Sequence, residues 1–218
     1  MSKQNKTFLV IAIILIAAIG LIYFRGKNNQ GGGQALVRSI NAADHLKGRL
    51  NAPIQMIVYS DFQCPFCVEF AETMKKVEEE FKDKVAIVFR HYPLSGHPEA
   101  EEAAEASECA AEQGKFWEMH DKLFADNAAG RLSTEQFKRD AVDLGLSQEQ
   151  FNQCLVSGKY ADKVSAQKAE GDQAGVTGTP TSFVNGNIYP GAYPFEDFIG
   201  SDGKPEKGMK SIIGNLLK

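Results

Sequence analysis

The stretch SDFQCPFCVEF, Ser60 to Phe70, places two cysteines three positions apart, with Pro65 and Phe66 between them. Cysteines at this spacing can form half of a zinc site, a redox couple or a structural disulfide. The flanking sequence indicates where they lie. Ile54 to Tyr59 is a mostly apolar run that predicts a buried strand, and apolar residues at helical spacing begin at Phe70. The two cysteines are therefore expected where a strand turns into a helix.

The rest of the chain extends this unit into an α/β fold. Val85 to Phe89 is a continuous apolar run, typical of a central strand covered on both faces, so a parallel βαβ unit is predicted. Residues from about 97 to 171 are rich in Ala, Glu, Gln and Lys at helical spacing and predict an all-helical insertion. Thr181 to Tyr189, with Asn185-Gly186 at its turn, predicts a hairpin, and a final helix follows. This order predicts a thioredoxin fold with an inserted all-helical subdomain.

The N-terminus carries a separate signal. Phe8 to Phe24 is an uncharged apolar run of 17 residues, within the lower range for a membrane span. We interpret residues 1–25 as a membrane anchor, with a cleaved signal peptide and a soluble domain as the alternative. Residues 26–35 predict a flexible linker, and residues 36–218 the folded domain. Either interpretation places the domain at the extracytoplasmic face of the cytoplasmic membrane, in the periplasm or at the cell surface, where disulfides persist.

The charge balance argues against nucleic acid as a partner. The formal net charge is −4, from 24 basic and 28 acidic residues. Residues 1–25 hold three of the basic residues and no acid, so the remainder carries 24 − 3 = 21 basic residues against 28 acidic ones. A domain that binds phosphate backbones needs a basic face, which this balance does not favour.

The spacing of the four cysteines favours redox chemistry at the first pair. Cys109 and Cys154 are separated by 44 intervening residues, whereas a zinc ribbon needs a second close pair, so no metal site is expected. A Cys64–Cys67 bridge would close too short a loop to stabilise the fold much. The start of a helix, in contrast, stabilises the thiolate of Cys64 and lowers its pKa. We expect Cys64 to be the exposed nucleophile and Cys67 to resolve a mixed disulfide.

The other two cysteines, Cys109 and Cys154, lie on predicted helices of the insertion. In an exported protein, an even remainder of two most simply forms a structural disulfide. Closing a loop of that length would stabilise the fold by about 4 kcal/mol on the chain-entropy estimate. Two unpaired core thiols and a second redox relay are the alternatives.

Three motifs in the same order resemble the DsbA-like branch of the thioredoxin superfamily. They are CPFC at the strand-to-helix turn, the helical stretch from His97 to Phe124, and GVTGTPTSFVNG from Gly175 to Gly186. The resemblance covers roughly residues 36 to 218. It implies that Cys64 attacks substrate and Cys67 resolves. It also implies a cis Thr179-Pro180 bond beside Cys64, where Thr179 can pair with an extended substrate, and a structural Cys109–Cys154 bridge.

The resemblance also implies partners. The expected substrates are unfolded or reduced exported proteins, with Phe66 and Tyr193 as apolar contacts. No cofactor beyond the cysteine pair is expected. Reoxidation is expected from a quinone-linked membrane oxidase resembling DsbB or the vitamin K epoxide reductase homologues. The alternatives are an extracytoplasmic reductase or isomerase, a tethered binding or chaperone module with a vestigial cysteine pair, and a Cu(I)-delivery protein.

Two positions depart from the pattern of the strongest oxidants. Many relatives carry a buried acid six residues before the first cysteine, where this chain has Val58, and Asp61 is expected to cap the helix or the loop instead. The strongest oxidants carry His between the cysteines, whereas Phe66 offers the thiolate no charge or hydrogen bond. We therefore expect an oxidant weaker than the His-containing type, whose potential is about −120 mV.

Several other polar and aromatic residues have plainer interpretations. Three histidines are expected to cap or pack rather than to bind metal, since their spacing shows no cluster: His91, His97 and His120. Phe116 and Trp117 are expected in the core of the insertion, with the lining of a substrate groove as the alternative.

Overall fold

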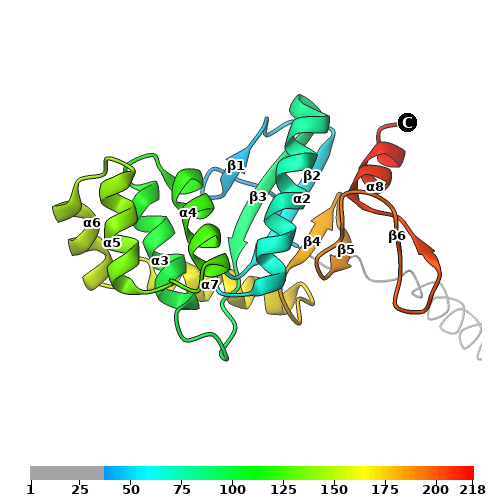
Figure 1. Ribbon diagram of the computed structural model, residues 1–218. Helices are drawn as coiled ribbons and strands as arrows, with labels where there is room; N and C mark the ends of the chain where they lie inside the picture. Colours follow the sequence, from blue (N-terminus) through cyan, green and yellow to red (C-terminus); the bar gives the residue numbers. More distant parts are fainter. Residues whose placement is uncertain (1–36) are drawn as a thin grey trace, which may run out of the picture. The chain divides into compact units, whose positions relative to one another are not determined.

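The computed structural model describes residues 37–218, so the predicted anchor and linker lie outside the described residues. Figure 1 shows a central sheet with helices around it, coloured along the chain from blue to red. Within residues 37–218, no helix combines the length and the hydropathy of a membrane-spanning segment. The strands are β1 (His45–Lys47), β2 (Ile54–Ser60), β3 (Val85–His91), β4 (Thr181–Val184), β5 (Asn187–Pro190), β6 (Phe198–Ile199) and β7 (Pro205–Glu206). The α-helices are α2 (Pro65–Phe81), α3 (Ala100–Ala111), α4 (Phe116–Ala128), α5 (Thr134–Asp143), α6 (Gln148–Val156), α7 (Ala161–Gln173) and α8 (Met209–Leu216).

Five strands form the main sheet, in the order β1-β3-β2-β4-β5. β2 and β3 are parallel, with Ile54 opposite Val85, and α2 connects them as a βαβ unit. β4 lies antiparallel on the other side of β2, and its hairpin with β5 turns at Asn185 and Gly186, both with positive φ. Helices α3 to α7 are inserted between β3 and β4. The topology confirms the predicted thioredoxin fold with an inserted all-helical subdomain.

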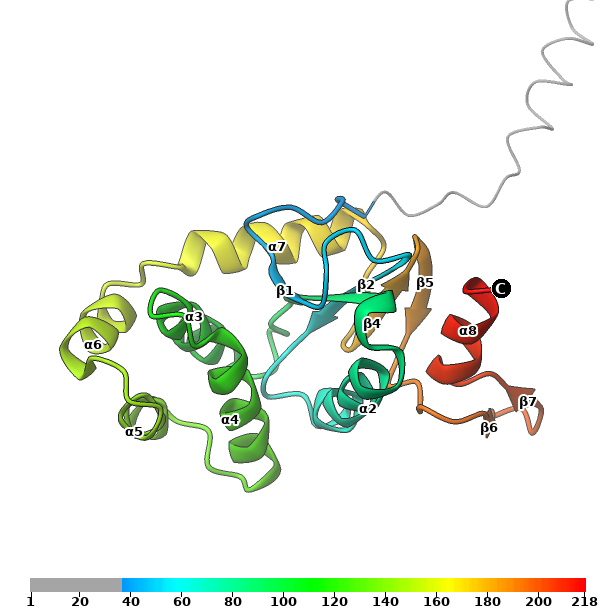
Figure 2. The same ribbon diagram turned by 90° about the horizontal axis from the view of Figure 1, so that it is seen from above.

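Both faces of the sheet are covered, because alternate residues of β2 pack against different helices. Met56 and Val58 belong to a core that includes residues of α2 and α8. Ile57 and Tyr59 belong to a second core, together with Ala174 just after α7. Figure 2 shows α7 on one side of the sheet and α2 on the other. This double packing fixes the end of β2, from which the cysteine motif follows.

The helical subdomain is built from helices with clear local boundaries. The side chains of Ser133 and Ser147 accept hydrogen bonds from backbone N–H groups in the first turns of α5 and α6. Gly145, with φ of 72°, follows the end of α5 in the left-handed conformation that glycine adopts most easily. The large apolar side chains of these helices are buried in the same core as the α2 face of the sheet, which joins the subdomain to the thioredoxin part.

Three short strands were not predicted from the sequence. β1 has three residues and pairs antiparallel with β3, with His45 opposite Phe89. β6 and β7 have two residues each and form a separate ribbon before α8. Strands of this length contain too few residues to show an alternating hydrophobic pattern.

Candidate functional site

The two cysteines of the CPFC motif lie at the start of α2. Cys64 is the N-cap residue of the helix, and Pro65 occupies the first helical turn, where its missing N–H group is not needed. The Cys67 N–H group donates to the carbonyl oxygen of Cys64 at 3.1 Å. Both cysteines are free thiols. The strand-to-helix position predicted from the sequence is therefore observed.

A distant loop completes the site. The peptide bond between Thr179 and Pro180 is cis, and the Sγ atom of Cys64 lies 3.3 Å from the carbonyl oxygen of Thr179. Pro180 directly precedes β4, which pairs with β2, the strand that leads to Cys64. The neighbouring strands thus bring the Thr-Pro loop and the cysteine motif together.

The surroundings of Cys64 favour its thiolate. A hydrogen bond from the Cys67 thiol is the largest influence that lowers the pKa of Cys64, to about 6 from 9.0. The Thr179 side chain and the backbone N–H groups of Cys67 and Phe66 act in the same direction, while burial opposes them. The helix start therefore provides hydrogen bonds to the ionised sulfur, as the sequence position suggested.

Cys67 has the opposite character. Burial, and then its hydrogen bond and charge interaction with Cys64, raise the pKa of the Cys67 thiol far above its ordinary value. The Ser60 side chain and the backbone N–H of Asp61 partly offset this effect. The pair is therefore chemically asymmetric, with one sulfur that ionises easily and one that keeps its proton. This asymmetry suits a nucleophile and a resolving cysteine.

The expectation that Cys64 is an exposed residue was wrong. Cys64 is only 3% exposed and Cys67 is 1% exposed. The Cys64 sulfur points toward Thr179, while the neighbouring Phe66 is 60% exposed. Sequence position indicates which cysteine comes first in the helix, but not how closely a loop from the other end of the domain approaches it. Phe66, like its neighbour Pro65, is thus exposed, and it is available as an apolar contact.

The position six residues before Cys64 holds no acid. Val58 is fully buried in the apolar core. A buried carboxylate is present elsewhere: Glu108 accepts hydrogen bonds at 2.9 Å from His45 and His91, and at 2.7 Å from the Lys163 ammonium. Burial alone would raise the pKa of Glu108, but the hydrogen bonds from His45 and His91 hold it well below its usual range. This cluster was not predicted from the sequence, because its members come from four separate elements.

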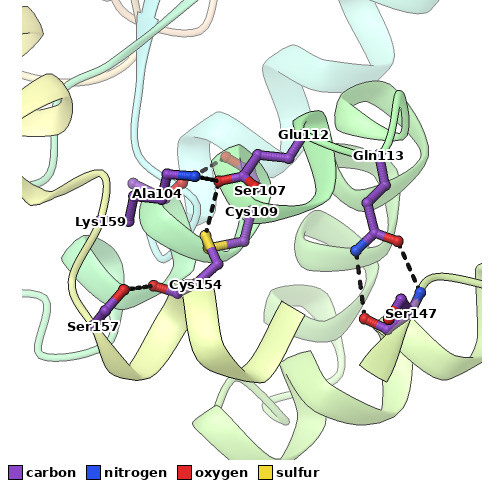
Figure 3. The surroundings of a disulfide bond; sticks show 9 residues. All are labelled: Ala104, Ser107, Cys109, Glu112, Gln113, Ser147, Cys154, Ser157 and Lys159. Carbon is purple, nitrogen blue, oxygen red and sulfur yellow. Dashed lines mark hydrogen bonds and ion pairs between the residues drawn. A yellow bond between two sulfur atoms is a disulfide. The ribbon is translucent and has the colours of Figure 1, made fainter. Parts of the chain in front are cut away.

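Cys109 and Cys154 form a disulfide that joins α3 to α6 (Figure 3). Their Cα atoms are 5.8 Å apart. Beside it, Glu112 forms an ion pair with Lys159 at 2.7 Å. The bridge lies within the helical subdomain, whereas the CPFC motif lies at the start of α2. This location suits a structural cross-link rather than a relay to the redox pair.

The remaining predicted residues have packing or capping contacts. His91 and His120 are buried, and the Nδ1 atom of His97 lies 2.6 Å from Asp61. Within residues 37–218, no group of three or more His, Cys, Asp or Glu side chains is arranged so that it could hold a metal ion. Phe116 is buried as expected, and Tyr193 packs edge-on against Tyr189. Asp61 caps the loop rather than the helix, since its Oδ1 atom accepts the Gln63 N–H group at 2.7 Å.

Comparison with known proteins agrees with this architecture. A family model described as Thioredoxin matches residues 41–200. The structure of alpha-DsbA1 from Wolbachia pipientis is similar with a TM-score of 0.65 at 24% identity, over 84% of this chain and 95% of that chain. BdbD from Bacillus subtilis, in its oxidised form, is similar with a TM-score of 0.68 at 21% identity, over 80% of this chain and 92% of that chain. At these identities the likeness shows a shared fold.

Curated relatives include a longer kind of protein. A Na(+)/H(+) antiporter, NhaA 1 of Mycolicibacterium gilvum, is 36% identical over 204 residues. The match covers 90% of this chain but 33% of the antiporter, so the chain spans about a third of this relative's length. Since residues 41–200 match the Thioredoxin model, the segment shared with the antiporter consists mainly of this domain.

Proposed function

Because the chain belongs to the thioredoxin family, we propose that it is a thiol–disulfide oxidoreductase that introduces disulfides into exported proteins through Cys64 and Cys67. The observation that carries the proposal is the asymmetry of the pair, in which the pKa of Cys64 is lowered and that of Cys67 is raised. A thiol of low pKa is a good leaving group, and stabilisation of its thiolate favours the reduced protein. Such a pair accepts electrons from substrate thiols.

The exchange proceeds in two steps. A substrate thiolate attacks the Sγ atom of Cys64 in the Cys64–Cys67 disulfide, and the electron pair of the broken S–S bond passes to Cys67. The buried Cys67 sulfur takes up a proton, because its surroundings disfavour a thiolate. The second substrate thiolate then attacks the substrate sulfur of the mixed disulfide and releases Cys64 as a thiolate. The substrate loses two electrons and two protons, of which one proton stays on Cys67 and one passes to solvent.

The Thr-Pro loop supplies a surface for the substrate chain. Thr179 lies at the Cys64 sulfur, two residues before the start of β4, so its backbone can pair with an extended peptide whose cysteine meets Cys64. Phe66, which is exposed beside the sulfur, offers an apolar contact for unfolded chains. Both features suit substrates that are not yet folded, because only these present extended backbone and apolar side chains.

The oxidant is of intermediate strength in this proposal. Thiols in this family have pKa values from about 7 in thioredoxin to about 3.5 in DsbA. Cys64, at about 6, falls between them, and Phe66 adds no charge to the thiolate. We therefore expect a reduction potential between about −270 and about −120 mV.

The proposed location is the extracytoplasmic face of the cytoplasmic membrane, with residues 1–25 as the anchor. The Cys109–Cys154 disulfide supports an oxidising compartment. A quinone-linked membrane oxidase would return the Cys64–Cys67 pair to the disulfide by removing two electrons. The transport activity of the antiporters is not extended to this chain, because the match covers about a third of the compared antiporter.

The test is oxidation of a reduced, denatured protein that contains two thiols by the disulfide form of this chain. We expect each molecule of the disulfide form to produce one substrate disulfide and to become reduced. Cys64→Ser should produce none. A Cys109→Ala/Cys154→Ala variant serves as the matched control and should react like the parent protein, because its redox pair is intact. Absence of substrate oxidation by the parent protein would overturn the proposal.

The direction of electron flow has its own test. Thiols are trapped by alkylation in intact cells, and the state of Cys64 and Cys67 is read by mass shift. We expect mostly disulfide for an oxidase. A mostly reduced pair would favour a reductase or isomerase, and a pair that does not exchange at all would favour a binding module.

A further inference from the structure

A second loop is fastened to the cysteine motif. Residues 92–99, here called the clamp loop, connect β3 to α3 and are hydrogen-bonded to residues 60–63. The contacts run from Tyr92 N–H to Ser60 O (2.8 Å), Leu94 N–H to Asp61 Oδ2 (2.9 Å), His97 Nδ1 to Asp61 Oδ2 (2.6 Å) and Glu99 N–H to Gln63 Oε1 (2.7 Å). The clamp loop therefore holds the backbone that leads into the redox pair.

Asp61 is the centre of these contacts. Its side chain is fully buried, whereas that of His97 is 25% exposed. A buried carboxylate accepts hydrogen bonds only, so the Nδ1 atom of His97 must be the donor. The backbone of Asp61 faces the cysteines: its carbonyl oxygen accepts the Cys64 N–H group at 3.2 Å, and its N–H group interacts with the Cys67 sulfur.

We propose that His97 is a positioning residue for the redox pair: by donating from Nδ1 to Asp61, it holds the Asp61 backbone in the orientation that places Cys64 and Cys67. The inference rests on the proposed function, since it concerns the same thiol–disulfide couple. His97 itself touches neither sulfur in the described contacts, so it acts through Asp61.

The expected effect follows from the directionality of hydrogen bonds. Without the His97 donor, the Asp61 carboxylate keeps only backbone donors, those of Gln63 and Leu94, and the cysteine loop gains freedom. The N–H groups that stabilise the Cys64 thiolate then align less well, and hydrogen bonds weaken steeply when misaligned. The thiolate becomes less stable, so the reduced form is less favoured and the protein becomes a weaker oxidant.

The experiment uses the full chain with four substitutions. His97→Leu removes the donor. His97→Gln introduces an amide group that lies farther from the backbone than Nδ1 does, so it does not replace the donor. His97→Asn places an amide donor where Nδ1 was, and Ser95→Ala changes an exposed residue of the same loop as a control. Two quantities are measured. The first is the pH midpoint of Cys64 ionisation, followed by thiolate absorbance. The second is the equilibrium constant for the oxidation of glutathione by the Cys64–Cys67 disulfide.

His97→Leu and His97→Gln should raise the ionisation midpoint and lower the equilibrium constant about threefold or more. His97→Asn and Ser95→Ala should leave both values near those of the parent protein. The inference is overturned if folded His97→Leu or His97→Gln protein matches the parent in both quantities, or if His97→Asn fails to restore them. A parent protein that shows no exchange with glutathione would instead overturn the proposed function.

Discussion

The Sγ atom of Cys64 lies 3.3 Å from the carbonyl oxygen of Thr179, a residue 115 positions further along the chain. The two meet because β4, which follows Pro180, pairs with β2, which leads to Cys64. In the proposed function, this contact places the backbone that would bind a substrate at the sulfur that would react with it. It also covers Cys64, which helps to explain why the residue is almost completely buried.

Removing Cys67 should weaken the acidity of Cys64. The hydrogen bond from Cys67 is the largest influence that lowers the pKa of Cys64 to about 6. In Cys67→Ala we expect the ionisation midpoint, followed by thiolate absorbance, to rise toward 9.0. Cys64→Ser is the control and should show no transition near pH 6. An unchanged midpoint in Cys67→Ala would show that the backbone N–H groups alone stabilise the thiolate.

The stability of the reduced protein should depend on pH with a definite sign. The pKa of Cys64 is lowered in the folded state from 9.0 to about 6, so the stabilising contribution is complete above pH 9 and is lost as the pH falls through about 6. A tenfold change in an acid ionisation constant corresponds to ~1.4 kcal/mol. Chemical denaturation should show the reduced form gaining stability over the oxidised form between pH 6 and 8. A constant difference over this window would contradict the lowered pKa.

A pair of buried carboxyl groups in the helical subdomain should have the opposite effect and make the stability of the fold decrease as the pH rises. Burial, and then the neighbouring Asp126, raise the pKa of Asp140 to about 6 from 3.8. A raised pKa stabilises the fold below pH 4, and this contribution is lost as the pH rises through about 6. Denaturation of the oxidised form, in which Cys64 does not titrate, should therefore show stability falling between pH 4 and 6 relative to Asp140→Asn.

Asp140→Asn tests this assignment directly. The amide keeps the shape of the side chain and cannot ionise, so the loss of stability that Asp140 causes between pH 4 and 6 should disappear. Arg131 and Lys122 also face the pair, at 2.6 Å from Asp126 and 3.7 Å from Asp140, but both stay charged in this range. If the same loss of stability with rising pH persists in Asp140→Asn, another titrating group must cause it.

The contact between α7 and the sheet should tolerate no side chain at Gly171. A Cβ atom there would lie 2.7 Å from Tyr92 and 3.0 Å from Tyr59, both buried. We expect Gly171→Ala to lower the free energy of unfolding by about 1–3 kcal/mol, measured by denaturant titration. Gly214→Ala, in α8, is the matched control, because nothing lies within 4 Å of its added Cβ atom. The control should be neutral or stabilising, since alanine favours helices over glycine.

The main elements of the fold could be predicted because their sequences carry strong local patterns. β2 is mostly apolar, β3 begins with a continuous apolar run, α2 has apolar residues at helical spacing, and Asn185-Gly186 marks the hairpin. These patterns arise from burial and backbone conformation, which act over a few residues. The order of these elements was enough to identify the fold.

The fine structure of the site depends on contacts between distant residues. Asp61 and His97 are 36 positions apart, and the Glu108 cluster draws on β1, β3, α3 and α7. Sequence alone gives the identity of such residues but not which of them meet. For the same reason the burial of Cys64 was not foreseen, since it depends on where the Thr179 loop comes to lie.

The most direct test of the central claim is to trap the mixed disulfide. Cys67→Ser protein is mixed with a reduced, denatured protein under oxidising conditions, and the cross-linked peptide is identified by mass spectrometry after non-reducing digestion. The account predicts a substrate cysteine bonded to Cys64, with the Cys109–Cys154 disulfide intact. A cross-link through Cys109 or Cys154, or none at Cys64, would contradict it.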